Sequence, residues 1–319
     1  MANVQAFVTD VMLQRYARLL GPSLGTFIAD DIFPAVDVPT KTGQFYDVDG
    51  GFASQSPGHG MVIADGQDSP LRISTSISKV TGWDVNANGL GVQLSKTSEA
   101  YAAGNGLNLR QANVAILARE CAILRERQAA DLAFDSSTTF SGKTTSLSGS
   151  DQWDNAASDP ISIGQTARDT IIQASGEAPN MAIMGYEVYK ALRQHPLILE
   201  FLSRTQNRVG ILTNDDIARA LDVETIWVGK AVANKNVDGQ TTDNQYIWGK
   251  SVLFAHIKKS PAPMTPGSCL QRWRFQGSTD GAVKRWDPTP YVEQVDMTWN
   301  DQFSAPTTDL GYLYTDVVS

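Results

Sequence analysis

Apolar residues near the start of the chain recur at helical spacing. This pattern predicts an amphipathic helix from Val8 to Leu20, which a glycine–proline pair then ends. The apolar positions are Val11, Met12, Tyr16, Leu19 and Leu20. The next segment, Phe27 to Val38, is punctuated by Pro34 and Pro39, and proline disfavours helix at the residue before it. We expect this segment to be an extended arm that lies over another part of the protein, not a core strand.

Glycine and polar residues dominate the region that follows the arm. Six glycines lie between residues 43 and 70, and large apolar residues are few, so this region buries little surface and is predicted to be a projecting loop. The glycines are Gly43, Gly50, Gly51, Gly58, Gly60 and Gly66. Apolar and polar residues then alternate from Leu71 to Ser78, which predicts a strand with one solvated face. Together they indicate a long two-stranded extension.

The strongest helical pattern runs from Asn108 to about Phe134. A stripe of apolar residues steps by three and four positions, which is typical of one buried helix face. The stripe consists of Val114, Leu117, Cys121 and Leu124, and charged residues on the other faces are Arg119, Glu120, Arg125, Glu126, Arg127 and Asp131. A helix of this length spans roughly 40 Å at the usual rise per residue. We expect it to be the backbone of the subunit, with its charged faces toward solvent or neighbours.

A Ser/Thr/Gly run from Ser136 to Ser150 is predicted to be a flexible linker before a compact α/β domain. In that domain, helical patterns alternate with short apolar runs that predict strands. Helices are predicted over Ile163–Ser175, over Glu187–Leu202 with a break or kink at Pro196, and over Asp215–Leu221 with a cap at Thr213 or Asn214. Strands are predicted over Met181–Met184, over Thr225–Val228, and from Tyr246 through Trp248 to His256, with a polar loop between residues 233 and 244. Arg272–Phe275 and Val295–Asn300 alternate like strands with one exposed face.

Composition and charge narrow the class of protein. The 319 residues carry 26 basic and 34 acidic side chains, a formal charge of −8, and the sequence pI is about 4.9. This balance argues against a broad basic surface that grips nucleic acid. No apolar stretch approaches the roughly 20 residues that span a bilayer, and the first residues do not show the pattern of a secretory signal. The two cysteines, Cys121 and Cys269, fit a reducing compartment.

Short motifs that suggest catalysis or binding are incomplete. Gly142-Lys143-Thr144 lacks the first glycine of a phosphate loop, whose place is taken by Ser137, and it follows a helix instead of a strand. The pairs at Gly89 and Gly104 lack the third glycine of a dinucleotide fingerprint. The run at Asp47 has no glutamate at the closing position of a calcium loop. We therefore predict a flexible linker at Gly142, turns at the other places, and no cofactor.

The histidines and cysteines do not form a recognisable site in the sequence. His59, His195 and His256 are far apart, and no helical metal-ligand pair or nucleophile elbow is present. Cys121 lies on the apolar stripe and is predicted to be a buried small side chain. We predict no catalytic, cofactor-binding or metal-binding residues. The basic group Arg272, Arg274, Lys284 and Arg285 is interpreted as a solvated strand face or as a partner for acidic groups on a neighbour.

The order of these features resembles that of the major capsid proteins of tailed double-stranded-DNA bacteriophages, whose fold is shared with encapsulins. The resemblance spans nearly the whole chain. Local runs that carry it are Asp30–Val36, Leu107–Arg110 before the long helix, Trp153–Asn155 with Ser158–Ile161, Pro179–Gly185 with Val188–Leu192 and His195-Pro196, Leu221–Val223, Ile226–Ala231 and Ile247–Gly249. The resemblance implies an α+β phage major capsid fold.

The same resemblance implies a division of the chain. Its parts are an N-terminal arm (1–42), an extended E-loop hairpin (43–80), a P-domain with the spine helix (81–155), an α/β A-domain (156–257), P-domain return strands (258–305) and a C-terminal strand that returns to the A-domain (306–319). The arm and the hairpin cannot bury their apolar residues within one subunit, so neighbours are needed to cover them.

The implied function is structural. We expect pentamers and hexamers that form an icosahedral virion shell around double-stranded DNA without sequence-specific contacts, assembled in the host cytoplasm with no membrane. Further implied partners are a separate scaffolding protein, a portal and a decoration protein. Covalent cross-linking through the E-loop is not expected, because no lysine lies between Lys41 and Lys79. The acidic balance predicts an inner wall that does not adhere to DNA, which a strongly basic inner face of the shell would contradict.

Three alternative functions remain open at this stage. An encapsulin-type compartment would use the same fold to hold cargo enzymes. An α/β hydrolase or transferase would explain the central domain, but would need a cleft with titratable groups. A tail or sheath protein would form tubes or rings.

Overall fold

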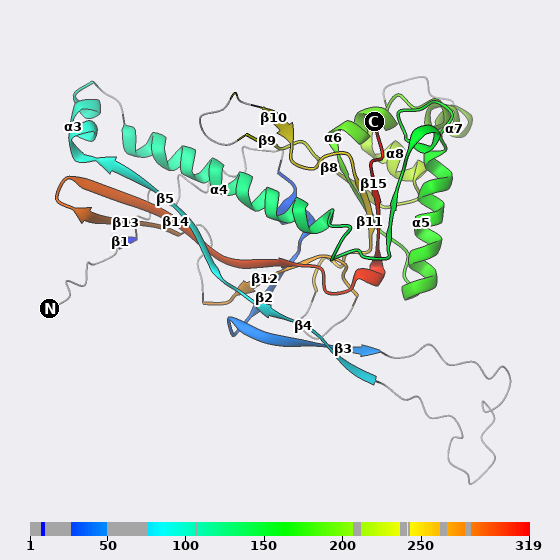
Figure 1. Ribbon diagram of the computed structural model, residues 1–319, viewed down its shortest axis with the longest axis horizontal. Coiled ribbons are helices and arrows are strands. Elements are labelled where there is room, and N and C mark those ends of the chain that lie inside the picture. The colour runs from blue at the N-terminus through cyan, green and yellow to red at the C-terminus, as the bar shows by residue number, and fades with distance from the viewer. Residues whose placement is uncertain are drawn as a thin grey trace, which may run out of the picture.

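The computed structural model describes residues 8–9, 27–49, 76–105, 108–206, 212–236, 241, 243–261, 267–277 and 282–319. Helices and sheets are mixed, as predicted for an α+β fold (Figure 1). The first part contains β1 (Val8–Thr9), α2 (Ala29–Ile32), β2 (Ala35–Val38), β3 (Thr42–Asp49), β4 (Ser76–Asp84), β5 (Ala87–Ser95), α3 (Lys96–Gly104) and α4 (Leu109–Ala133). The central part contains β6 (Thr144–Ser146), η2 (Gly149–Asp151), α5 (Pro160–Ser175), β7 (Met181–Gly185), α6 (Tyr186–Leu192), α7 (Pro196–Gln206), α8 (Asn214–Ala220), β8 (Thr225–Gly229), β9 (Val232–Asn234), β10 (Asn244–Tyr246) and β11 (Val252–Ala255). The last part contains β12 (Gln271–Phe275), β13 (Ala282–Thr289), β14 (Val292–Ser304), η3 (Thr308–Leu310) and β15 (Gly311–Thr315).

One sheet is built around the long strand β14. Its order is β1-β13-β14-β12-β2, and β5 also pairs with β14. The spine helix α4 runs beside β5 and β14 (Figure 1). Its stripe residues Val114, Leu117 and Cys121 pack against Val295 and Trp299 of β14 in a buried cluster. The helix and the sheet therefore bury one face each, as an amphipathic helix over a half-solvated sheet does.

The second sheet is buried on both faces, which explains its continuous apolar strands. Its order is β6-β15-β11-β7-β8. Along β7, Ala182 and Met184 face a core that includes α5, α6 and α8, whereas Met181 and Ile183 face a second core. The second core contains the C-terminal end of α4 and the helix α2. The last strand, β15, pairs with β11, so the end of the described chain lies in the same sheet as the central strands.

Most predicted helices and strands are confirmed. The helix α4 begins after the cap residue Asn108 and ends before Phe134. Pro196 separates α6 from α7, and Thr213 caps α8 through a capping box with Asp216. The strands β7, β8, β12 and β14 cover the predicted runs.

Several predictions near the start of the chain are wrong or fall outside the described residues. In the predicted helix from Val8 to Leu20, Val8–Thr9 instead form β1, which pairs with β13, and the remainder lies outside the described residues. The arm contains a short helix, α2, and its strand β2 joins the sheet at an edge, with Val36 and Val38 buried. The strand predicted over Leu71 to Ser78 is described only from Ser76 and continues to Asp84.

Two predictions in the central region are also wrong. The strand predicted from Tyr246 to His256 is broken by a turn, in which Gly249 has a φ of 47°. The run from Ser136 to Ser150 is not a loose linker. It contains β6, which pairs in parallel with β15, and the fully buried Phe140.

Candidate assembly surfaces

The hairpin of β3 and β4 is a separate two-stranded sheet that leaves the rest of the subunit (Figure 1). Its strands pair antiparallel from Thr42↔Asp84 to Asp49↔Ser76. A two-stranded ribbon is at best marginally stable by itself in water, and more strands or a packed face are needed for stability. The hairpin is therefore a surface that another molecule can cover.

The arm is fixed to its own subunit by hydrogen bonds and charge. Its residues Phe33, Val36 and Val38 are buried there, so the expectation that the arm cannot bury its apolar residues within one subunit is wrong. The strand β2 pairs in parallel with β12, and Asp37 accepts two hydrogen bonds from Arg274, with Oδ–N distances of 2.6 and 3.0 Å. These bonds hold the pKa of Asp37 below its ordinary value. Pro34 and Pro39 flank the strand, and proline protects an exposed sheet edge from unwanted pairing.

A buried glutamate joins the arm, the spine helix and the central domain. Glu126 of α4 is 1% exposed. Its Oε1 accepts from the backbone N–H of Ile28 at 2.9 Å and from the indole N–H of Trp248 at 2.6 Å, and its Oε2 accepts from the backbone N–H of Ala29 at 3.0 Å. Burial raises the pKa of Glu126, and these donors offset part of that effect. The carboxylate satisfies the open N–H groups at the start of α2, as a capping side chain does.

The sequence pattern does not reveal this role, because Glu126 lies off the apolar stripe, among the charged residues of the other faces. A signal was present: Ala129 and Ala130 follow it by three and four positions, on the same side of the helix, and both are buried. The predicted stripe residue Leu124 is instead 38% exposed. The buried face of α4 is therefore continued past Cys121 by small residues and one carboxylate.

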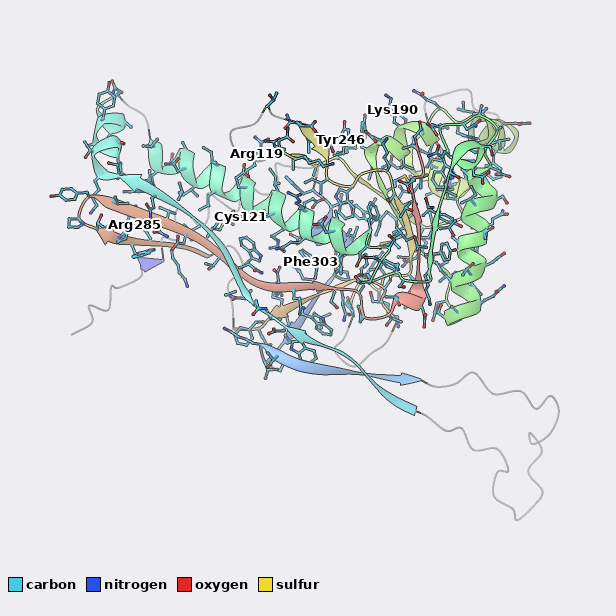
Figure 2. The ribbon with its side chains drawn as sticks, in the orientation of Figure 1. Arg119, Cys121, Lys190, Tyr246, Arg285 and Phe303 are labelled. Atoms are coloured by element: carbon cyan, nitrogen blue, oxygen red, sulfur yellow. The ribbon has the colours of Figure 1, made fainter. Side chains whose placement is uncertain are left out.

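An alternating set of charges lies next to this junction. Arg125 and Arg272 each contact both Asp30 and Asp301, with N–O distances between 2.6 and 3.3 Å. The guanidinium of Arg125 lies over the ring of Phe303, 5.8 Å from its centroid. Phe303 lies near the end of β14, between that strand and α4 (Figure 2). The set connects α2, α4, β12 and β14.

The basic group predicted on the return strands is largely used inside the subunit. Arg272 and Arg274 pair with aspartates of the arm and of β14, as described above. Arg285 lies 3.7 Å from Glu293, which also binds Arg110 at 2.8 Å. The predicted solvated face is therefore wrong for Arg272, whose side chain is 10% exposed, whereas the side chains of Arg274 and Arg285 remain more than a third exposed.

The structure brings one serine and one histidine together, but not as a nucleophile and its base. Ser158 Oγ lies 3.1 Å from His195 Nε2, and both side chains are buried. The hydroxyl donates to the carbonyl of Asn155 at 2.9 Å, and His195 Nδ1 has no partner among the described residues. A catalytic histidine needs an orienting acceptor at that nitrogen and access for a substrate. The pair instead connects the turn before α5 to the start of α7.

The other suggested motifs lie in structural positions. Gly89 lies within β5 and Asp47 within β3, so the turns predicted at these two places are wrong. Lys143 pairs with Asp309, and its carbonyl accepts from the N–H of Leu313, so this segment is part of the central sheet and not a phosphate loop. His256 Nδ1 contacts the carbonyl of Ala178 at 2.7 Å. His59 lies outside the described residues. Within the part of the chain that the structure describes, three or more His, Cys, Asp or Glu side chains do not gather as a metal site, and no helix is long and apolar enough to cross a bilayer.

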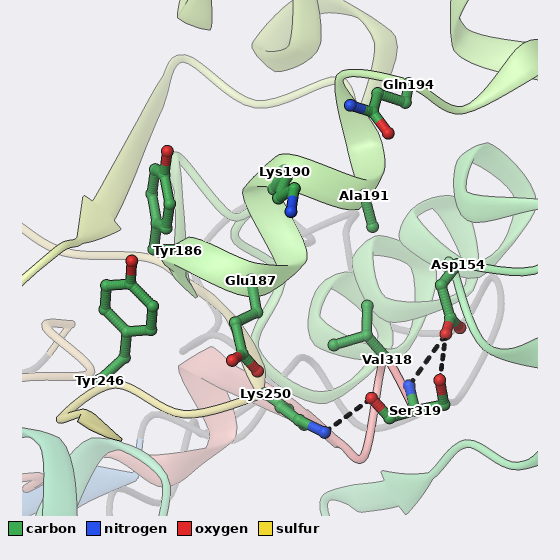
Figure 3. Close-up of a pocket in the computed structure, with 10 residues that line it drawn as sticks. All are labelled: Asp154, Tyr186, Glu187, Lys190, Ala191, Gln194, Tyr246, Lys250, Val318 and Ser319. Carbon is green, nitrogen blue, oxygen red and sulfur yellow. Dashed lines mark hydrogen bonds between the residues drawn. The ribbon is translucent and has the colours of Figure 1, made fainter. Parts of the chain in front are cut away.

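A surface pocket of about 400 Å³ opens beside α6 (Figure 3). Tyr186 and Tyr246 form one wall, with ring centroids 5.2 Å apart, and Lys190 lies near them. Opposite, Lys250 donates to the carbonyl of Ser319 at 2.6 Å, and Asp154 accepts from the Ser319 backbone at 3.2 Å. The charged residues that line this pocket are Asp154, Glu187, Lys190 and Lys250.

Comparison with known proteins agrees with this architecture. Residues 139–261 match the family described as phage major capsid protein E. The chain is 30% identical over 149 residues to the major capsid protein of Burkholderia phage BcepMu, and the alignment covers 47% of each chain. The chain therefore aligns with about half the length of this curated relative. The relatives are named as structural proteins, as predicted, and not as enzymes.

Solved structures extend the likeness to nearly the whole chain. A phage-related protein from Bordetella bronchiseptica RB50 superposes with a TM-score of 0.71 at 21% identity, over 98% of this chain and 99% of that one. The capsid of cyanophage P-SCSP1u superposes with a TM-score of 0.54 at 12% identity, over 90% of this chain and 87% of that one. The chain thus has the phage capsid fold, and its predicted resemblance to phage major capsid proteins is confirmed.

Proposed function

We propose that this chain is a major capsid protein that assembles with copies of itself into pentamers and hexamers of an icosahedral virion shell around double-stranded DNA. The observation that carries the proposal is the 30% identity to a named major capsid protein, on a chain whose fold is that of phage capsids. The proposal includes the division into an arm (1–42), an E-loop hairpin (43–80), a P-domain (81–155 and 258–305), an A-domain (156–257) and a C-terminal strand (306–319).

The projecting hairpin supports assembly with further copies. In the sheets of the described residues, β3 and β4 pair only with each other, so a neighbouring copy would supply a covering layer beyond the root of the ribbon. Two tyrosines at the opposite end of the long strands, Tyr101 and Tyr291, are 78% and 76% exposed. Exposed tyrosines are frequent anchors of protein interfaces. Many such contacts, each weak, would stabilise a closed shell through multivalency.

The charge distribution supports a container for DNA without sequence-specific contacts. The net charge is −8, and Arg272, Arg274 and Arg285 are paired with carboxylates of the same subunit. Phosphate binding by such a surface would be weak at physiological salt. A separate scaffolding protein, a portal and a decoration protein are the further partners of this proposal, and the host cytoplasm is its place of assembly.

The test is to express the chain alone and together with the scaffolding protein of its phage. Size-exclusion chromatography with negative-stain electron microscopy should show rings of five or six subunits or closed shells in at least one condition. Closed shells filled with host enzymes would instead favour an encapsulin-type compartment. Monomers or dimers in both conditions would overturn the proposal.

A further inference from the structure

The root of the hairpin is held by a pair of stacked tryptophans. Trp83 of β4 lies on Trp273 of β12, with ring centroids 5.0 Å apart and ring planes inclined by 29°. The indole N–H of Trp83 donates to the carbonyl of Thr40 at 3.1 Å. Trp273 is buried in a small cluster that also contains Val36, Val38 and Val85. The ring of Trp83 is therefore fixed on one face by the body of the subunit and at its edge by the bend between β2 and β3.

A glycine on the opposite strand makes room for this ring. Gly43 pairs with Trp83, and a Cβ atom added to Gly43 would lie 2.1 Å from Cζ2 of Trp83 and 2.4 Å from its Cε2. No real side chain tolerates such distances, so any other residue at this position would displace the indole. The tryptophan and the glycine are therefore matched across the two strands.

Hydrogen bonds fix both strands just behind this pair. The N–H of Val85 donates to the carbonyl of Lys41 at 2.8 Å, and the N–H of Asp84 donates to Oε1 of Gln302 on β14 at 2.8 Å. Just beyond the pair, the register shifts: Gly43 faces Trp83, but Phe45 faces Val80, so β4 has one residue more than β3 in this interval. Such a bulge bends a ribbon and increases its twist. The direction of the hairpin is therefore set within a few residues of Gly43.

We propose that Gly43, Trp83 and Trp273 form a clamp that fixes the direction in which the hairpin leaves the subunit. In the sheet pairing of the described residues, the hairpin strands β3 and β4 pair only with each other. A small rotation at the root would therefore displace the far end of the ribbon by a large distance. A fixed direction presents the hairpin to a neighbouring copy already oriented, which lowers the entropy cost of each contact. This use of the clamp rests on the proposed function, whereas the clamp itself concerns the single subunit.

Hydrogen–deuterium exchange by mass spectrometry on dilute, unassembled subunits tests the clamp directly. In Trp83→Ala and Gly43→Ala, the amides of residues 42–49 and 76–84 should exchange at least about tenfold faster than in the parent protein, while amides of α4 and β7 keep their rates. Trp83→Phe retains a stacked ring and should give intermediate rates. Trp286→Ala is the matched control, because Trp286 is a half-buried tryptophan of β13 outside the clamp. It should leave exchange in the hairpin unchanged.

Unchanged hairpin exchange in a folded clamp variant would overturn the inference. Should Trp83→Ala fail to fold, Gly43→Ala decides the matter, since it keeps the tryptophan and only displaces it. Assembly is scored separately: the clamp variants should form fewer or irregular particles than the parent protein. A parent protein that never assembles would contradict the proposed function. The clamp would still be tested by hydrogen–deuterium exchange on the unassembled subunit.

Discussion

At the scale of single residues, the buried carboxylate of Glu126 joins the arm to the spine helix and to Trp248. We predict that Glu126→Gln lowers the free energy of unfolding by about 1–3 kcal/mol, because an amide has one acceptor oxygen and its NH2 group would face a buried donor. Urea unfolding of the unassembled subunit measures this change. Glu120→Gln, an exposed change on the same helix, should shift the free energy by less than about 0.5 kcal/mol. Equal effects of the two substitutions would contradict the role assigned to Glu126.

The two cysteines provide a second test at this scale. Both are buried, and burial raises the pKa of each thiol to about 12. At pH 8 such a thiol is ionised in roughly one molecule in ten thousand, and only the thiolate is reactive. We predict that a disulfide reagent such as dithionitrobenzoate labels neither Cys121 nor Cys269 within minutes in the native subunit, and labels both in urea. Rapid labelling of the native protein would show that the cores around these residues are open.

The hydrogen bonds of Asp135 lead us to predict that the folded state loses stability at acidic pH. Hydrogen bonds from Thr138 and Ser137 hold the pKa of Asp135 well below its ordinary value of 3.8. A carboxyl whose pKa is lower in the folded state contributes stability above its ordinary pKa, and this contribution is lost as the pH falls toward the folded value. Asp135→Asn should therefore lower the melting temperature at pH 7 and flatten the decline in stability below about pH 4. Thermal melts from pH 7 to pH 2 measure this. Melting temperatures of the parent protein and of Asp135→Asn that fall in parallel would refute the prediction.

At the scale of elements, the sequence predicts those helix ends and breaks that depend on neighbouring residues in the chain. The limits of α4, the break at Pro196 and the cap at Thr213 followed from spacing, proline and capping residues. The break between β10 and β11 did not, because Trp248 and Gly249 continue an apolar run while the turn is imposed by contacts with β7. The burial of Glu126 depends on where α2 and Trp248 pack, and no local pattern encodes their positions.

The contact between the turn and β7 yields a prediction for that element. A Cβ atom at Gly185 would lie 1.9 Å from the carbonyl oxygen of Gly249, and backbone cannot yield as a side chain can. Gly185→Ala should cost about 1–3 kcal/mol, the usual range for overpacking. Gly104→Ala is the control, because the space beside Gly104 in α3 is open and alanine favours helix. Denaturant melts that rank the two variants in the reverse order would contradict the described packing.

At the scale of the whole molecule, the subunit has two large sheets and a separate ribbon. Each large sheet packs against helices of its own subunit, whereas the hairpin projects from them (Figure 1). Arm, spine helix and central domain meet at Glu126 and at the charges around Arg125, which favours their movement as one body. The sequence order of arm, hairpin, spine and α/β domain was enough to predict the fold, because each part carries a distinct pattern. The register at Gly43 and Trp83 and the ion pairs between distant segments could not be predicted, since they depend on tertiary packing.

In the proposed function, this subunit builds a closed shell through its hairpin and its exposed edges. Electron cryomicroscopy of particles formed by the chain, with its scaffolding protein where needed, tests this proposal. We predict icosahedral particles in which rings of five and six subunits are joined, with each β3–β4 ribbon lying on a neighbouring subunit. Tubes, stacked rings, or shells in which the ribbon contacts no other copy would contradict the account.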